Sequence, residues 1–99
     1  MSLSEGQFEV HISAHMFSRL RELQRRAALS GRGDEMVTAF LRALLRLKSD
    51  SWDFGEPSYR LPAMRLQIRC AVVPPLIVHF GVSEDRPIVY VKGVESLTE

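Results

Sequence analysis

The chain is poor in cysteine, in long apolar runs and in net charge. Its single cysteine, Cys70, cannot form an internal disulfide, which is typical of proteins from reducing compartments. No stretch approaches the roughly 20 apolar residues that a membrane-spanning helix needs. A formal net charge of +1 does not by itself demand a nucleic-acid partner. We therefore expect neither a disulfide-stabilised fold nor a membrane protein.

Several sequence motifs are also missing. Glycine-rich phosphate loops and serine-nucleophile motifs do not occur. His11 and His15 have no cysteine or carboxylate partners at metal-ligand spacing, so we predict no metal site and no small-molecule cofactor. The first residues do not form a basic segment followed by an apolar one, and we therefore expect a cytoplasmic protein.

What is present indicates one small globular domain. The 99 residues, 45% of them apolar and 25% charged, leave room for one core and exclude a second domain. We expect a single domain over residues 1–99, in which residues 1–6 are disordered or a remnant of expression.

The first half of the chain predicts one strand and two helices. Residues 7–12 alternate between polar and apolar side chains as a strand does. Ser13 can cap a helix that runs to about residue 29, and Asp34 and Glu35 begin a second helix that ends near Lys48. The second helix is apolar over an unusually wide surface, which suggests that it packs on both its partner helix and the sheet.

The second half predicts an antiparallel meander of three strands over residues 65–72, 76–82 and 87–94. Even-numbered residues from Leu66 to Val72, Cys70 included, are expected to face the core. A polar turn at residues 83–86 joins the last two strands. If Val82 pairs with Pro87, the facing pairs are Phe80 with Val89, Val78 with Val91, His79 with Tyr90 and Ile77 with Lys92.

The predicted fold class is α+β, in the order strand-helix-helix-strand-strand-strand. Its sheet is antiparallel, with two helices on one face and the other face open. Residues 49–64 are expected to be irregular, with aromatic side chains that pin the segment to the domain or, alternatively, stack on a base. Six polar side chains are predicted to share the open face, joined in principle by Gln7, Glu9 and His11. They are Arg65, Gln67, Arg69, His79, Tyr90 and Lys92.

This order resembles the RelE/ParE family of toxins from bacterial toxin–antitoxin operons. The likeness rests on "FGEPSYRLP" leading into "RLQIRCAVV" and on the hairpin "LIVHFGVSEDRPIVYVKGV". The positions that match the family's loop and strand pattern are Gly55, Pro57, Leu61, Arg65 and Arg69. Ribonuclease members typically end with a short basic motif and a terminal tyrosine or histidine, whereas this chain ends with residues 92–99 as KGVESLTE.

The resemblance implies a toxin that cleaves mRNA without a metal, by attack of a ribose 2′-hydroxyl on the adjacent phosphate. Such chemistry needs a base, an acid and cations around the phosphorane. Arg65, Arg69 and Lys92 suit the cationic role, and we infer that His79 or Tyr90 supplies the acid or base. The predicted contacts to RNA or to an antitoxin are Arg60, Arg65, Gln67 and Arg69. The implied partners are a cognate antitoxin and mRNA on the ribosome.

Other interpretations stay open. A gyrase-poisoning ParE-type toxin needs no catalytic residues, and a catalytically silent RelE-like protein-binding domain would fit the altered C-terminal residues equally well. In both cases His79 and Tyr90 would form a plain cross-strand pair on a solvated face. Residues 7–48 also look similar to a ribbon-helix-helix DNA-binding protein, which would place Gln7, Glu9 and His11 in the major groove.

Overall fold

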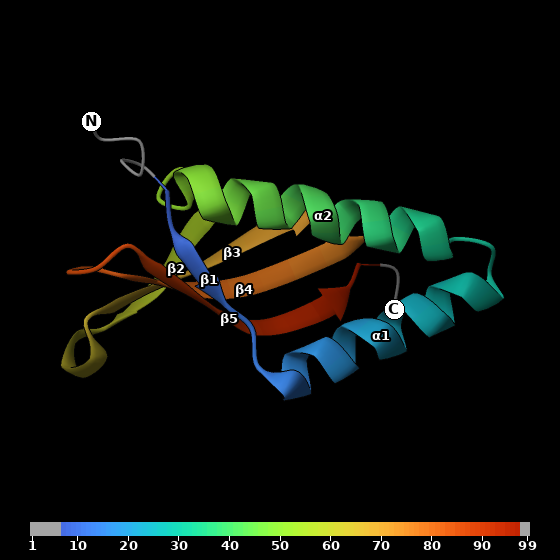
Figure 1. Cartoon of the computed structure of the whole chain (residues 1–99), viewed down its shortest axis with the longest axis horizontal. Helices are drawn as coiled ribbons and strands as arrows, with labels where there is room; N and C mark the ends of the chain where they lie inside the picture. Colours follow the sequence, from blue (N-terminus) through green and yellow to red (C-terminus); the bar gives the residue numbers. More distant parts are fainter. Residues whose placement is uncertain (1–6, 98–99) are drawn as a thin grey trace.

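A computed structural model describes residues 7–97, so the expectation for residues 1–6 lies outside the described residues. The α+β class is confirmed, with two helices and a five-stranded sheet (Figure 1). In chain order the elements are β1 (Glu9–His11), α1 (Ala14–Leu29), α2 (Gly33–Asp50), β2 (Glu56–Leu61), a 3₁₀ turn (Pro62–Met64), β3 (Leu66–Val73), β4 (Leu76–Ser83) and β5 (Ile88–Ser96). No helix within residues 7–97 is long and apolar enough to cross a membrane.

Both predicted helices are confirmed, and their ends follow local chemistry. The Ser13 hydroxyl accepts a hydrogen bond from the Met16 backbone N–H at 3.1 Å, as expected of an N-cap. Gly31, with a φ of 74°, turns the chain between the helices. Asp34 and Glu35 occupy the first turn of α2, where the helix dipole favours negative charge.

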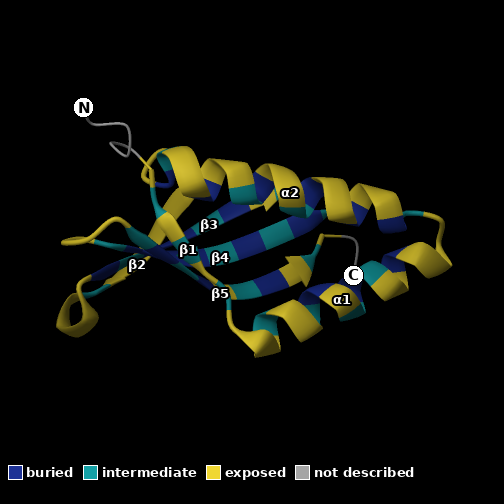
Figure 2. Cartoon of the chain, viewed as in Figure 1, coloured by how far each residue is buried: buried dark blue, intermediate teal, exposed yellow. Residues whose placement is uncertain are grey.

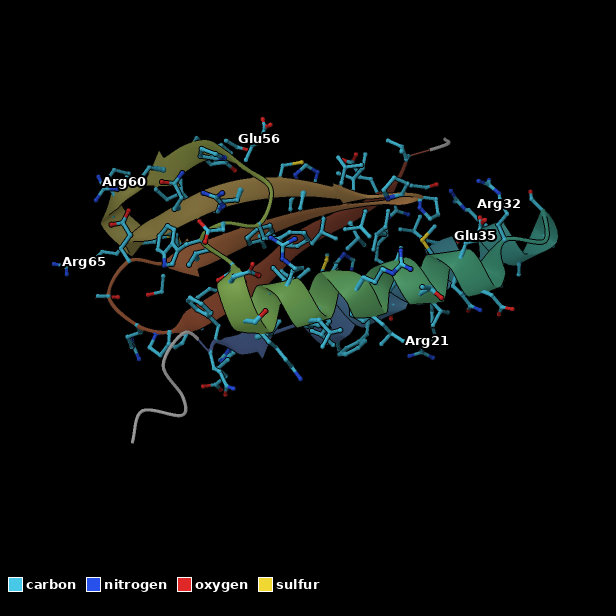
Figure 3. The ribbon with its side chains drawn as sticks, turned by 90° about the horizontal axis from the view of Figure 1, so that it is seen from above. Arg21, Arg32, Glu35, Glu56, Arg60 and Arg65 are labelled. Carbon is cyan, nitrogen blue, oxygen red and sulfur yellow. The ribbon has the colours of Figure 1, made fainter. Side chains whose placement is uncertain are left out.

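The two helices cover one face of the sheet, with α1 against β5 and α2 against β3 and β4 (Figures 1 and 3). Small residues of α2, Ala39 and Ala43, allow the helix to approach the strands closely. Phe80 is fully buried and its ring is stacked on Phe54 at a centroid distance of 5.6 Å. Buried positions are concentrated between the layers, as Figure 2 shows.

The predicted sheet was wrong in two respects. The strand order is β1-β5-β4-β3-β2, and β1 runs parallel to β5, so the sheet is mixed rather than antiparallel. In addition, β2 forms a fifth strand inside the segment that was expected to be irregular. It is an exposed edge strand with a bulge between Pro57 and Tyr59, so it lacks the alternation that marks a half-buried strand.

The meander of β3, β4 and β5 is confirmed, but its predicted register was wrong. Val82 pairs with Val89, Phe80 with Val91 and His79 with Gly93, instead of Pro87, Val89 and Tyr90. A shift of two residues keeps the valines on the same face, so the hydrophobic pattern does not distinguish the two registers. A bulge at Lys92 then moves the pairing by one further residue, which places Val94 opposite Val78.

The expectation for the β3 faces was also wrong. Arg69 and Ala71 face the helices, since they pair with the core residues Phe80 and Val78. Leu66 and Ile68 lie on the face away from the helices, which we call the outer face, and they are nonetheless buried. A Cβ atom at Gly81 would lie 3.1 Å from Ile68 Cδ1, so the missing side chain makes room for this packing. The outer face is therefore partly apolar.

Candidate functional site

A cleft of about 850 Å³ opens where β1 passes into α1, beside the 3₁₀ turn and the β4–β5 turn. The middle of β5 contributes Tyr90 and Lys92 to its lining. His11 comes from β1, and His15 comes from the first turn of α1. The cleft therefore gathers residues that are about 80 positions apart in the chain.

The cleft is lined by more positive than negative charge. Arg65, Arg86 and Lys92 carry permanent positive charges, whereas Asp85 is the one acid among the described lining residues. Asp85 Oδ2 lies 3.5 Å from Arg65 Nη1 in an exposed ion pair, which contributes little energy and can be exchanged for a ligand contact. The N-terminus of α1 adds positive potential, because no acidic side chain occupies its first turn. An anionic ligand suits this lining.

His11 and Tyr90 lie side by side because β1 and β5 pair in parallel register. Their rings make an edge-to-face contact with centroids 5.3 Å apart. Glu9 Oε2 lies 2.9 Å from His11 Nε2. A carboxylate is an acceptor, so this contact favours the tautomer that carries its proton on Nε2 and leaves Nδ1 as a free base. An imidazole and a phenol thus lie together in the lining of the cationic cleft.

Of the residues predicted from sequence, the structure places Arg65, Tyr90 and Lys92 together in the cleft. Arg65 caps the 3₁₀ turn in a left-handed conformation with a φ of 53°. Its side chain projects from the end of the sheet that lies opposite the loop between the two helices (Figure 3). This backbone conformation turns the chain sharply out of the 3₁₀ turn and into β3, so that Arg65 and Leu66 both reach the cleft.

Arg69 and Gln67 do not join them. Arg69 is buried on the helix side of β3, where Nε donates to the carbonyl oxygen of Phe54 at 3.1 Å and Nη2 to that of Gly55 at 3.0 Å. Gln67 donates to the carbonyl oxygen of Tyr59 at 3.3 Å. The prediction that all six polar side chains share one face was therefore wrong, because Arg69 replaces a core side chain and satisfies backbone carbonyls instead.

His79 is on the outer face, as predicted, but it lies outside the cleft and beside Gly93. Its Nε2 atom is 3.5 Å from Glu95 Oε2. Arg60 is engaged by Glu84 through two hydrogen bonds, one of them between Nη2 and Oε1 at 2.8 Å. This contact lowers the pKa of the Glu84 carboxyl from its ordinary value, chiefly through the hydrogen bond from Arg60. Neither Arg60 nor Glu84 lines the cleft.

Sequence reasoning missed His15 and Arg86 and gave His11 a minor place. The signal that could have found His11 was its position on the outer side of a short alternating strand. What the alternation could not indicate is that this strand pairs in parallel with the last one. Arg86 was assigned to the turn. The backbone N–H groups of Asp85 and Arg86 donate hydrogen bonds to the Ser83 hydroxyl, and all three residues line the cleft.

Within residues 7–97 no group of three or more histidine, cysteine, aspartate or glutamate side chains is arranged to hold a metal ion. Cys70 is half-buried, and burial together with the negative charges of Glu95 and Glu56 raises the pKa of its thiol. A raised thiol pKa disfavours the reactive thiolate. Comparison with known proteins gave no match to any family model, curated protein or solved structure.

Proposed function

We propose that the chain is a metal-independent endoribonuclease, the toxin component of a toxin–antitoxin system of the RelE/ParE kind. The single observation that carries the proposal is the parallel pairing of His11 with Tyr90 in a cleft that is also lined by Arg65, Arg86 and Lys92. The family resemblance supplies the biological setting, with a cognate antitoxin and mRNA as partners. The cleft supports the proposal because it brings a candidate base, a candidate acid and three cationic side chains together.

In the proposed reaction, His11 Nδ1 accepts the proton of a ribose 2′-hydroxyl, and the 2′-oxygen attacks the adjacent phosphorus. Glu9 holds the imidazole through Nε2 and stabilises the imidazolium that forms. Arg65, Arg86 and Lys92 stabilise the pentavalent phosphorane. The Tyr90 hydroxyl donates its proton as the bond to the 5′-oxygen breaks. The products are a 2′,3′-cyclic phosphate and a free 5′-hydroxyl.

These roles differ from those expected from the sequence in two ways. His11 takes the place of His79, because His79 lies outside the cleft, and Arg86 takes the place of Arg69, because Arg69 is buried. The ribbon-helix-helix interpretation gains no support, since β1 is incorporated into the sheet beside β5.

The test is cleavage of a defined mRNA by the purified protein in the presence of excess EDTA. We expect cyclic-phosphate ends, and we expect His11→Ala and Tyr90→Phe each to lower the rate by about 10²- to 10⁴-fold. His79→Ala is the matched control, because it removes an imidazole from the same face but outside the cleft. Equal losses for His11→Ala and His79→Ala would refute the assignment.

A companion measurement separates the alternatives. Expression without an antitoxin should arrest growth and leave cleaved transcripts. Arrest with supercoiling defects and intact transcripts would instead assign the chain to gyrase poisoning. Normal growth at high expression of folded protein would favour a silent protein-binding domain.

A further inference from the structure

The outward side of α2 carries an apolar stripe made of Val37, Leu41 and Leu45. These side chains are 42%, 53% and 67% exposed, respectively. The buried side of the same helix is formed by other residues, namely Met36, Ala39, Ala43 and Leu47. The width of the apolar surface of this helix predicted packing on both its partner helix and the sheet. The structure leaves the stripe uncovered, and the exposed ring of Phe17 on α1 adjoins it near Val37.

Opposite charges flank the stripe. Asp34 lies one turn before Val37, and Lys48 lies one turn after Leu45. Spacings of three and four residues place all five side chains on one side of a helix. Both charged side chains are exposed, and neither side chain forms a hydrogen bond or ion pair with any other residue between 7 and 97.

This arrangement is self-complementary when two copies of the helix lie antiparallel. With Leu41 at the centre, Val37 of one copy lies level with Leu45 of the other, and Asp34 lies level with Lys48 of the other. Each charge pair is then attractive and occurs twice, as a two-fold interface requires. A parallel arrangement would bring Asp34 to Asp34 and Lys48 to Lys48, and it would also align the two helix dipoles unfavourably.

We propose that this stripe is the interface of a two-fold symmetric homodimer in which the α2 helices of two copies pack antiparallel about Leu41. The occupant is a second copy of this chain, since its own α2 supplies both the apolar stripe and the charges in the complementary order. A contact of two helix faces is small, and interfaces below about 1,200 Å² in total belong to weak complexes. We therefore expect a dimer that forms reversibly with rising protein concentration.

The first test is sedimentation of the full chain over a dilution series, with dissociation expected in the range of about 1–100 µM. Leu41→Glu should leave the protein monomeric over that range. Leu29→Glu is the matched control, because Leu29 is an exposed leucine at the end of α1, 87% accessible and outside the stripe. A wild-type chain that stays monomeric throughout would overturn the proposal and leave the stripe to a different protein.

Charge exchange tests the antiparallel order. Asp34→Lys alone and Lys48→Asp alone should each weaken the dimer by about tenfold, because each creates two repulsive contacts. The double exchange should restore wild-type dissociation. If the two single effects simply add in the double variant, the two residues do not face each other.

Crosslinking tests the centre of the interface in a Cys70→Ser background. Leu41→Cys should form a disulfide-linked dimer with diamide as the oxidant. Leu45→Cys should not, because the two copies of residue 45 would lie about 12 Å apart along the helix axes, beyond the reach of a disulfide. Equal crosslinking at both positions would indicate a parallel pair and overturn the proposal.

Discussion

Replacement of Arg69 by methionine separates a role in stability from a role in phosphate binding. Methionine keeps the apolar length of the side chain but removes the guanidinium that donates to the carbonyl oxygens of Phe54 and Gly55. A hydrogen bond from a charged donor contributes about 1.5–3 kcal/mol, and the cost of burying the guanidinium offsets part of that sum. We expect the free energy of unfolding to fall by about 2–4 kcal/mol.

The measurement is urea denaturation followed by tryptophan fluorescence. Trp52 is the single tryptophan and lies two residues before Phe54, so its emission reports on the segment that Arg69 holds. A loss of this size lowers the thermal midpoint by roughly 10–25 °C in a domain of this length.

Arg65→Ala is the control, because Arg65 is exposed and lines the cleft. It should leave stability nearly unchanged and lower the salt dependence of RNA binding by about one ion. A wild-type free energy of unfolding for Arg69→Met, together with a reduced salt dependence of RNA binding in that variant, would refute the structural role of Arg69.

Local packing and charge determine the expected behaviour of three further positions, Gly55, Glu84 and Cys70. Gly55→Ala should destabilise the fold by at least about 3 kcal/mol in the same denaturation assay, because a Cβ atom there would lie 2.3 Å from the Cys70 carbonyl oxygen at a φ of 71°. Glu84→Gln should reduce the loss of folding free energy in acid. Arg60 lowers the pKa of the Glu84 carboxyl from its ordinary value, so the ion pair stabilises the fold above the ordinary pKa. This stabilisation is lost as the pH falls through the lowered pKa. Stability curves between about pH 2 and 7 would show this as a shallower slope for the variant. Cys70 should react slowly with iodoacetamide in the native state and rapidly in urea, since its thiol pKa is raised; equal rates would contradict that environment.

Local signals predicted the helices well, because caps and periodicity act within a few residues. Ser13 and the acidic pair at the start of α2 define helix ends without reference to the rest of the chain. The strands β3, β4 and β5 were equally visible from their apolar residues. Their pairing was not, since a shift of two residues buries the same valines and the bulge at Lys92 has no signature in sequence.

The candidate site was predicted only in part for a related reason. Alternation divides a strand into two faces but does not state which face meets the helices. On β3 the helix side holds Arg69, whose charge is satisfied by backbone carbonyls that the sequence does not reveal. The outer side holds Leu66 and Ile68, which pack over Gly81. His11 and Tyr90 meet because distant strands run parallel, and no local pattern indicates that.

The parallel pairing of β1 with β5 also bears on how the protein folds. The helices and the meander of β3 to β5 can each form from nearby segments, whereas β1 and β5 are joined across a loop of about 80 residues, which is the most costly closure in the chain. This contact should be the last to form. The cleft that depends on this contact would then stay incomplete until the rest of the domain has folded. While β5 is still inside the ribosome, a nascent chain would expose His11 without Tyr90 beside it.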